Sequence, residues 1–272
     1  MAGDHKLIAE DTLRILKEGF YINHKNERIA IAAAMQQAVD NTKLFTPREL
    51  DHLAGNIHGD KAFNTVYEVI NETTLDAVLS NILTSENILC LNFASAKNPG
   101  GGFLGGAVAQ EESITRASAL YPCLLNAPRY YAYHKLHKSC LYSDHMIYAP
   151  NVPVFKNEAG NVMDDYITVS VITSPAVNAG AVKQNERSNI QMLLPVMEKR
   201  MDKLLGLCAY YNHDVLILGA WGCGVFQNEP EDIAALFEMF LKGKYDGLFR
   251  KIVFAVKASN ERFIEPFRKR FL

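Results

Sequence analysis

The chain of 272 residues is long enough for one large domain, or for one domain with an appendage. Nearly half of its residues (49%) are hydrophobic and 21% are charged, a composition that excludes general disorder. The 28 basic residues nearly balance the 30 acidic ones, so no strong positive field attracts a polyanion over its whole length. If the protein handles an anionic polymer, we therefore expect it to hold one or two units in a pocket.

The cysteines and the apolar segments indicate the compartment. The five cysteines are an odd number and form no CxxC pair, which fits poorly with a disulfide framework. The N-terminal residues lack the apolar region of a signal peptide, and no uninterrupted apolar run approaches the roughly 18 residues of a transmembrane helix. We expect reduced thiols, a cytoplasmic location and no membrane partner.

The first sixty or so residues have a helical pattern. We predict a first helix that ends near Gly19, a second helix over 29–40 and a short third helix over 47–55. We interpret residues 1–63 as a helical extension packed on a core formed by residues 64–272.

From Asn64 onward, predicted strands alternate with predicted helices, which indicates an α/β layered sheet. The run over 87–93 is almost entirely apolar, as expected of a strand that is buried on both faces. In such sheets ligands bind beyond the carboxyl ends of the strands. The predicted strands are 65–70, 87–93, 146–150, 166–173, 215–219 and 251–256, and the predicted helices are 73–84, 108–120, 187–211, 231–242 and a last one from about 260.

A first unusual loop, within residues 92–113, follows the buried strand. It holds five glycines in the seven residues 100–106, more than a structural turn needs, and they let the backbone approach a ligand closely. The loop then delivers Gln110, Glu111 and Glu112 near the start of a helix, where backbone N–H groups favour anions. The alternative is that the two carboxylates only stabilise the helix dipole.

A second unusual loop spans residues 219–232, after another apolar strand. Its glycines free the backbone so that successive N–H groups can surround a diphosphate. No Lys or Arg lies in this loop, so amides and a helix N-terminus would have to neutralise any phosphate. The loop matches neither the GxxxxGK[ST] sequence of nucleoside triphosphatases nor a GxGxxG dinucleotide fingerprint.

Together, the two loops resemble those of the bacterial-type poly(ADP-ribose) glycohydrolases of the macrodomain superfamily. NPGGGFLGGAVAQEE is similar to the family signature of three glycines, a spacer and QEE, and the spacer here is residues 103–109. GAWGCGVFQNEP resembles the diphosphate-binding loop of the family, and ITVSVITSPAVN resembles a strand and turn common in it. The resemblance runs from about Asn64 to the C-terminus and implies a three-layer α/β/α macrodomain with a central mixed sheet and an N-terminal helical extension.

The resemblance also implies roles for the matched residues. Glu112 matches the catalytic glutamate, and Glu111 matches the carboxylate that holds the ribose hydroxyls. Asn98 matches an asparagine at the same ribose, and Phe226 an aromatic residue that shapes the distal ribose position. The other substrate-binding residues implied are Gly100, Gly101, Gly102, Gln110, Gly222, Cys223, Gly224 and Val225.

The implied activity is hydrolysis of ribose–ribose O-glycosidic bonds, mainly from the chain end, with release of ADP-ribose. A poorly hydrated glutamic acid beside a second carboxylate can have a raised pKa and protonate the leaving oxygen. Adjacent helical residues point about 100° apart, so one glutamate should orient the ribose while the other transfers the proton. The implied substrates are poly(ADP-ribose) and ADP-ribosylated macromolecules, with no metal, no cofactor and no obligate protein partner.

Two other functions stay open. The chain could be a macrodomain that binds ADP-ribose without turnover, although a binding module needs no paired acids. It could also hydrolyse another ADP-ribosyl linkage, on a mono-ADP-ribosylated protein or on nucleic acid, because the same pocket and acid would serve.

We interpret several other histidine, aromatic and cysteine residues as structural and not as catalytic or metal-binding. We expect His134 and His137 to be solvated surface residues and not zinc ligands, because no Cys or acidic ligand completes a pattern. We interpret the tyrosines of 130–133 as packing residues, and Trp221 as a brace for the second loop. Cys223 has no evident histidine partner that would make it a nucleophile. Residues 121–145 show no clear pattern.

Overall fold

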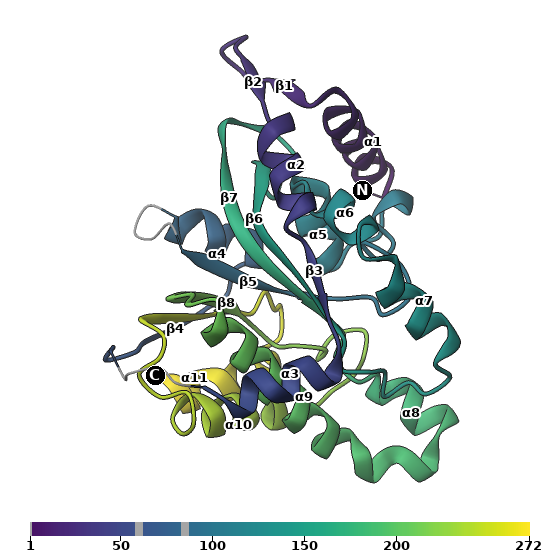
Figure 1. Ribbon diagram of the computed structural model, residues 1–272, viewed down its shortest axis with the longest axis vertical. Helices are drawn as coiled ribbons and strands as arrows, with labels where there is room; N and C mark the ends of the chain where they lie inside the picture. The colour runs from purple at the N-terminus through teal and green to yellow at the C-terminus, as the bar shows by residue number, and fades with distance from the viewer. Residues whose placement is uncertain (1, 58–61, 83–86) are drawn as a thin grey trace.

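The computed structural model describes residues 2–57, 62–82 and 87–272. Its centre is a seven-stranded mixed sheet (Figure 1). The pairs β7–β5, β5–β8, β8–β9 and β9–β4 are parallel, whereas β6 is antiparallel to both of its neighbours, β3 and β7. In spatial order the strands are β3 (Lys43–Phe45), β6 (Met146–Lys156), β7 (Val162–Ser174), β5 (Ile88–Phe93), β8 (Val215–Leu218), β9 (Lys251–Ala255) and β4 (Val66–Ile70).

Helices cover both faces of this sheet, which confirms the predicted three layers (Figure 1). Leu89 and Leu91 of β5 pack into one core, while Ile88 and Cys90 pack into the other, as the alternation of side chains along a strand requires. The first core is covered by α3 (Pro47–Gly55), α9 (Leu193–Tyr210), α10 (Pro230–Leu241) and α11 (Glu265–Phe271), and the second by α1 (Ala2–Glu18), α2 (Ala32–Asp40), α4 (Thr74–Asn81), α5 (Gln110–Ala117), α6 (Leu120–Leu125) and α7 (Pro128–Leu136).

Several helix ends have local causes that the sequence contains. Gly19 follows α1 with a φ of 75°, which a residue with a side chain adopts only at a cost. Thr46 and Glu49 form a capping box at the start of α3, and the Thr73 side chain caps α4 by accepting a hydrogen bond from Asp76 N. Among the described residues, no helix combines the length and the apolar character needed to cross a membrane.

The N-terminal segment is less helical than predicted. The second helix begins at Ala32 and not at residue 29, because β2 (Arg28–Ala30) pairs with β1 (Phe20–Ile22) in a hairpin. Strand β3 pairs with β6 and becomes an edge strand of the main sheet. Strands of three residues are too short to show an alternating pattern in sequence. The division at residue 63 stays a prediction, but the segment before it contributes a strand to the sheet.

The C-terminal two thirds follow the predicted alternation, with shifted boundaries. The helix predicted over 108–120 ends at Ala117, because Ser118 is extended and forms a bridge to Val154. The long helix predicted from residue 187 begins as a 3-10 turn, η2 (Arg187–Met192), and α8 (Ala179–Asn185) precedes it. A further 3-10 turn, η3 (Glu261–Phe263), precedes α11. Residues 83–84 of the helix predicted over 73–84 lie outside the described residues.

Candidate active site

Three loops meet at the carboxyl ends of the adjacent parallel strands β7, β5 and β8. They are residues 175–178, 94–109 and 219–229, so both glycine loops predicted from the sequence lie at the same edge of the sheet. A Cβ atom on Gly219 would lie 3.1 Å from the ring of Phe93, so the start of the second glycine loop touches the end of β5. This edge is where ligands bind in layered α/β sheets.

The Glu111 carboxyl group is enclosed by hydrogen-bond donors from the first loop. Its Oε2 accepts from the backbone N–H of Ser95 at 2.6 Å, and its Oε1 accepts from the side-chain amide of Asn92 at 3.2 Å. The backbone of Gly100 also donates to it. The residue is only 3% exposed, and this burial raises the pKa of Glu111 to about 8. Most Glu111 side chains are therefore protonated at neutral pH.

The Glu112 carboxylate lies on the next position of α5 and has a different partner. Its Oε1 accepts a hydrogen bond from the backbone N–H of Gly102 at 2.9 Å, and the residue is 9% exposed. Glu111 is thus the more deeply buried of the two neighbouring acids.

Gly101 brings the loop backbone against both carboxyl groups. Its φ of 61° favours glycine, and an added Cβ would lie 2.3 Å from Glu112 Oε1 and 3.1 Å from Glu111 Oε2. A side chain at this position would displace both groups. The predicted approach of this glycine backbone to a ligand stays a prediction.

The Gln110 side chain is held by protein partners, and its predicted contact with substrate stays a prediction. Its Nε2 donates to the Leu91 carbonyl and to Thr74 Oγ1, and its Oε1 accepts from Phe93 N. Because these bonds fix the start of α5 to β5 and α4, we assign a positioning role to Gln110. Asn98, in contrast, is exposed on the loop, and its carbonyl accepts from Gly101 N at 3.0 Å.

The second loop presents unpaired backbone amides. Within the described chain, the N–H groups of Gly224, Val225 and Phe226 have no acceptor. Gly224 and Val225 are exposed, so these groups can reach a ligand. Gly222 turns the chain with a φ of 74°, and Asn228 fixes that turn by donating to the Gly222 carbonyl at 3.1 Å. Successive free amides of this kind form an anion-binding concavity.

Buried side chains join the second loop to the turn after β7. Trp221 is fully buried and donates from Nε1 to the Ser174 carbonyl at 3.2 Å, which confirms it as a brace. Asn228 donates to the Val177 carbonyl at 2.8 Å. The Cys223 thiol is buried and its pKa is raised by that burial, so it does not provide a thiolate nucleophile.

Two buried oxygens at the carboxyl ends of the central strands have no hydrogen-bond partner among the described residues. They are Asn92 Oδ1 on β5 and Ser174 Oγ on β7. Unsatisfied buried polar groups are uncommon in native structures and call for an explanation, such as a role in a functional site. Asn92 lies beside Glu111, and both oxygens lie at the sheet edge where the glycine loops meet, which agrees with the placement of a ligand at this edge.

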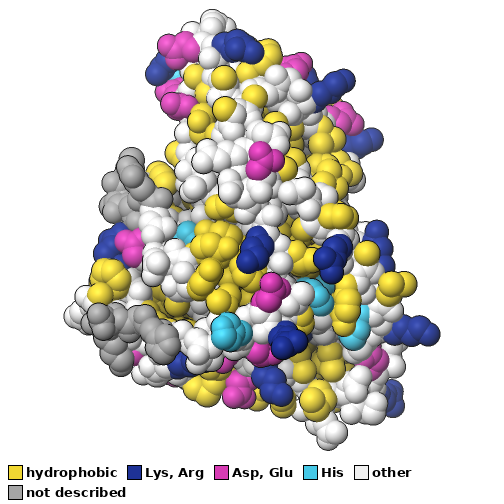
Figure 2. Space-filling model, in the orientation of Figure 1, with side chains coloured by type: hydrophobic (Ala, Val, Ile, Leu, Met, Phe, Trp, Pro, Cys, Tyr) yellow, Lys and Arg dark blue, Asp and Glu magenta, His cyan; other side chains and the backbone are white. Residues whose placement is uncertain are grey.

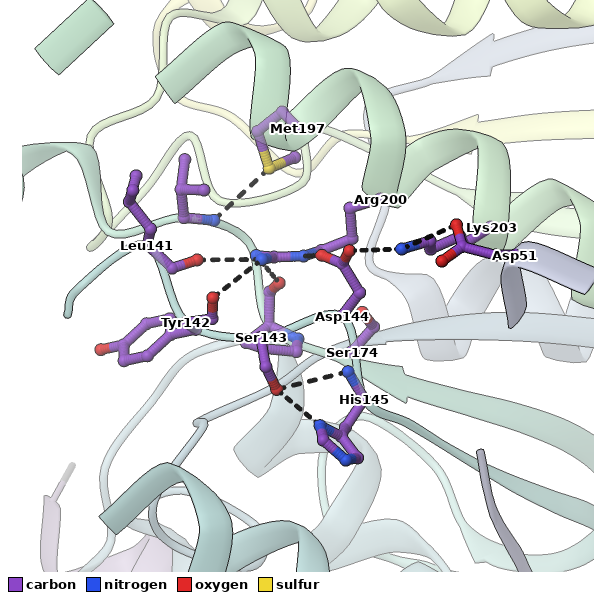
Figure 3. Close-up of polar contacts among 12 residues, drawn as sticks. Asp51, Leu141, Tyr142, Ser143, Asp144, His145, Ser174, Met197, Arg200 and Lys203 are labelled. Atoms are coloured by element: carbon purple, nitrogen blue, oxygen red, sulfur yellow. Dashed lines mark hydrogen bonds and ion pairs between the residues drawn. The ribbon is translucent and has the colours of Figure 1, made fainter. Parts of the chain in front are cut away.

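Arg200 holds the loop residues 141–144 by hydrogen bonds, a role that the sequence did not reveal (Figure 3). This fully buried residue of α9 donates from Nη1 to the Pro175 carbonyl and from Nη2 to the Leu141 carbonyl, both at 2.9 Å. Its Nε donates to Asp144 Oδ1 at 2.8 Å, and Lys203 pairs with the other oxygen of Asp144 at 2.7 Å. The arginine thus joins the turn after β7 to the loop after α7.

Tyr142, in that loop, is a further residue that sequence reasoning missed. Its φ of 55° is strained for a residue other than glycine, and strain of this kind is concentrated at functional sites. Its ring centroid lies 5.9 Å from that of Phe226, in the second glycine loop. The backbone partner of Tyr142 is Arg200, which lies too far along the chain for a local pattern to indicate it.

The other residues considered from sequence are structural. His134 is fully buried, contrary to the predicted solvated position. Its Nδ1 contacts the Tyr130 carbonyl, its Nε2 lies 2.8 Å from Ser143 Oγ, and burial lowers its pKa to about 4. Tyr130 and Tyr131 are buried packing residues, as predicted. Within the described ranges, no group of three or more His, Cys, Asp or Glu side chains is arranged to hold a metal ion.

A cavity of about 670 Å³ lies at the opposite edge of the sheet, away from both glycine loops. It is lined by His52, Tyr210, Asp214 and Phe63, among others. These residues lie near the N-terminal ends of the parallel strands β8 and β4. This cavity is therefore separate from the candidate active site, which the two glycine loops form.

Comparison with known proteins agrees with this geometry. The poly(ADP-ribose) glycohydrolase from Thermomonospora curvata is 38% identical to this chain, with a TM-score of 0.94 over 98% of this chain and 99% of that one. The enzyme from Deinococcus radiodurans, solved in complex with ADP-ribose, is 40% identical, with a TM-score of 0.83 over 87% of this chain and 96% of that one. No curated protein sequence matches significantly. The family model described as "Microbial-type PARG, catalytic domain" matches residues 9–157, and the chain belongs to this family of poly(ADP-ribose) glycohydrolases.

Proposed function

We propose that this chain hydrolyses the ribose–ribose O-glycosidic bonds of poly(ADP-ribose), mainly from the chain end, and releases ADP-ribose. The observation that carries the proposal is the convergence of Glu111, Glu112 and the backbone of Gly101 at the edge where the second glycine loop presents free amides. Membership of the family supports the activity, and a Thermomonospora relative solved with the inhibitor ADP-HPD supports a ligand of this class.

The free amides of residues 224–226 supply the site for the diphosphate. Backbone N–H groups can neutralise this anion in a loop that contains no Lys or Arg. With the diphosphate there, the sugar of the same unit extends toward the end of β5. Glu111 and the exposed Asn98 then hold its hydroxyl groups. Glu111 suits this role because its neutral carboxyl group can both donate and accept hydrogen bonds.

Glu112 acts as the general acid and base in this proposal. It donates a proton to the 2′-oxygen of the leaving ribose as the C1″–O bond breaks, and an oxocarbenium-like sugar forms. Its carboxylate then takes a proton from the water that adds to C1″, which restores the starting protonation state. A neutral Glu111 adds no negative charge that would oppose the approach of the anionic substrate.

A product assay tests this function directly. The protein is incubated separately with poly(ADP-ribose), with a mono-ADP-ribosylated protein and with ADP-ribosylated DNA, and free ADP-ribose is measured. We expect release from the polymer. Binding without any release would indicate a non-catalytic macrodomain, and faster release from a mono-ADP-ribosylated substrate would indicate another linkage specificity.

Glu112→Gln tests the assigned role. The amide keeps the size of the side chain but cannot donate and recover a proton, so turnover should fall by about 10²–10⁴. The affinity for ADP-ribose, measured by calorimetry, should stay within a few-fold of wild type. Near-wild-type turnover in this variant would remove Glu112 from the reaction.

We propose a cytoplasmic location. All five cysteines are free and four of them are buried, which is typical of a protein from a reducing compartment.

A further inference from the structure

Residues 113–143 contain no Asp or Glu, although the whole chain has a net charge of −2. The same segment contains four basic residues, of which Arg116 is buried. The other three are exposed on α7 or immediately after it. They are Arg129, Lys135 and Lys138.

The inner face of α7 is buried and lies near Glu111. Tyr130 and Tyr131 are buried there, and burial together with the nearby Glu111 raises the pKa of both phenols. The outer face carries Tyr133, which is 44% exposed. The same short helix therefore approaches the catalytic carboxyl groups on one side and presents a basic surface to solvent on the other.

The exposed ring of Tyr133 is held between two imidazoles. Its ring stacks on that of His137 with centroids 5.7 Å apart and planes 17° apart, and it lies 4.5 Å from the ring of His145. His145 is itself fixed by the hydroxyl of Ser143, 2.8 Å from its Nδ1 (Figure 3). Figure 2 shows basic, histidine and apolar side chains gathered over α7, on the right-hand side. We call this the α7 surface: Arg129, Tyr133, Lys135, His137, Lys138 and His145.

The α7 surface is connected to the candidate active site through further aromatic rings. The ring of His134, on the buried side of α7, lies 6.0 Å from that of Tyr142. Tyr142 in turn lies 5.9 Å from Phe226 in the second glycine loop. The α7 surface and the candidate active site are therefore joined by packed side chains of neighbouring segments.

An ordinary solvated helix face would explain the lysines but not the whole arrangement. Exposed cations on helices commonly pair with carboxylates one turn away, whereas Arg129, Lys135 and Lys138 have no carboxylate partner in the described part of the chain. An exposed tyrosine held in place by two imidazoles has lost rotamer freedom that it would keep in water. Both features are expected of a surface that stacks bases and pairs with phosphates.

We propose that the α7 surface binds ADP-ribose units of the polymer that lie outside the active site. The lysines and the arginine pair with diphosphates, and an adenine packs against the exposed part of the Tyr133 and His137 rings. The positive charge of the α7 surface favours an anionic polymer. Because the surface adjoins the candidate active site, we expect this polymer to be the poly(ADP-ribose) chain that is being cleaved and not a separate nucleic acid. This inference rests on the proposed function, since it takes poly(ADP-ribose) as the substrate.

The test measures binding of long poly(ADP-ribose) chains and of single ADP-ribose, separately, in the Glu112→Gln background so that the polymer is not cleaved. In that background we compare Lys135→Glu/Lys138→Glu and Tyr133→Ser with two matched controls. Lys17→Glu/Lys199→Glu makes the same charge change at exposed positions on other helices, and Tyr210→Ser removes an exposed tyrosine elsewhere.

The α7 variants should bind long polymer about tenfold more weakly, with unchanged affinity for single ADP-ribose. The affinity of the lysine variant for polymer should also depend less steeply on salt, because each lost phosphate contact removes about 0.7 from the slope. The controls should match the parent protein. An equal loss of affinity for monomer and polymer would overturn the proposal, since the variants would then act through the active site.

Two further results would overturn the proposal that the α7 surface binds the polymer. The first is an RNA of similar length that competes with equal affinity, which would make the surface a general site for nucleic acid. The second is a parent protein that binds polymer no more tightly than ADP-ribose. Polymer binding is measured without cleavage, so failure of this proposal is distinguishable from absence of hydrolysis in the wild-type enzyme.

Discussion

Glu111 and Glu112 are neighbours in sequence, but only Glu111 is enclosed by donors from Asn92, Ser95 and Gly100. Burial raises the pKa of Glu111 from 4.5 to about 8. Between these pH values the folded chain retains a proton that the unfolded chain has released. The folded state therefore loses stability as the pH rises from 4.5 to 8, and the loss is complete above pH 8.

Glu111→Gln should remove this pH dependence. Because the amide cannot ionise, the variant should be more stable than wild type above pH 8, by about 1–4 kcal/mol, and similar to it below pH 4.5. Turnover should fall, since a misplaced ribose reduces the rate. Urea unfolding across the pH range measures the first effect, and the product assay measures the second.

Glu198→Gln, at an exposed position of α9, is the control and should alter neither property. A Glu111→Gln variant whose stability follows wild type at every pH would contradict the assignment of a buried proton to Glu111.

Gly224→Val tests the second loop. An added Cβ at this position meets no atom within 4 Å, so the fold should tolerate the change. The β-branched side chain restricts the backbone and fills space beside the free amides, so ADP-ribose should bind at least about tenfold more weakly, which corresponds to losing about 1.4 kcal/mol. Calorimetry measures the affinity.

Gly55→Val, at the end of α3 and outside both glycine loops, is a matched control, because an added Cβ there also meets no atom within 4 Å. If Gly224→Val binds ADP-ribose as tightly as wild type and is folded, the diphosphate does not lie at this loop.

At the scale of single residues, the sequence predicted the motif positions well but not their environments. The glycines and the paired acids are contiguous, so their proximity to one another is set by local geometry. The donors that enclose Glu111 are Asn92, at the end of β5, and Ser95, in the loop that follows it. Arg200 and Tyr142 were missed because their contact joins segments that are distant in sequence.

Helix α1 supports the element that carries both glutamates. It contacts α5 and the 3-10 turn η1 (Phe103–Gly105) of the first glycine loop. Thr12 Oγ1 donates to the Arg116 carbonyl at the end of α5, at 2.5 Å. Thr12 Oγ1 also accepts from the buried ammonium group of Lys156 at 2.8 Å. The helix therefore restrains the first glycine loop and α5 from outside.

Thr12→Val should weaken this support. The valine leaves the Arg116 carbonyl and the Lys156 ammonium without one partner each, which should lower the free energy of unfolding by about 1–3 kcal/mol. We also expect a several-fold lower turnover, because small shifts of catalytic groups reduce the rate. Thermal unfolding and the product assay provide the two measurements.

Lys6→Ala, on the exposed face of the same helix, is the control, and its ion pair with Glu10 should contribute little. A Thr12→Val variant that loses stability but keeps full turnover would limit α1 to a structural role.

At the scale of elements, the sequence predicted the central alternation of strands and helices because the buried strands and capped helices have strong patterns. The sequence did not predict elements that are short, or strands whose partners are distant in the chain. The hairpin of β1 and β2, the edge strand β3 and helix α7 are the main examples. Strand β3 is only three residues long, and its partner β6 begins about a hundred residues later.

For the whole molecule, the structure of the second loop favours attack at the chain end. Phosphate binding by backbone amides needs few ion pairs, so the affinity for single ADP-ribose should fall only gently with salt. We expect free ADP-ribose to appear from the start of the reaction while long chains shorten gradually. A time course resolved on a gel measures this.

Early accumulation of fragments of intermediate length, with little free ADP-ribose, would mean that the enzyme cleaves internal bonds. The Glu112→Gln variant provides the background for that gel, since it should release neither product.

The pairing of β5 also determines when the site can exist during synthesis. Both neighbours of β5 come later in the chain, with Leu89 opposite Ser170 and Ile88 opposite Val215. A nascent chain that emerges from the ribosome therefore carries β5 with two unsatisfied edges until β7 and then β8 have followed. Parallel pairing between distant segments forms slowly and exposes such edges to other chains. Glu111 and Glu112 are synthesised early. The proposed binding site for ADP-ribose is incomplete until the loop after β8 has left the ribosome.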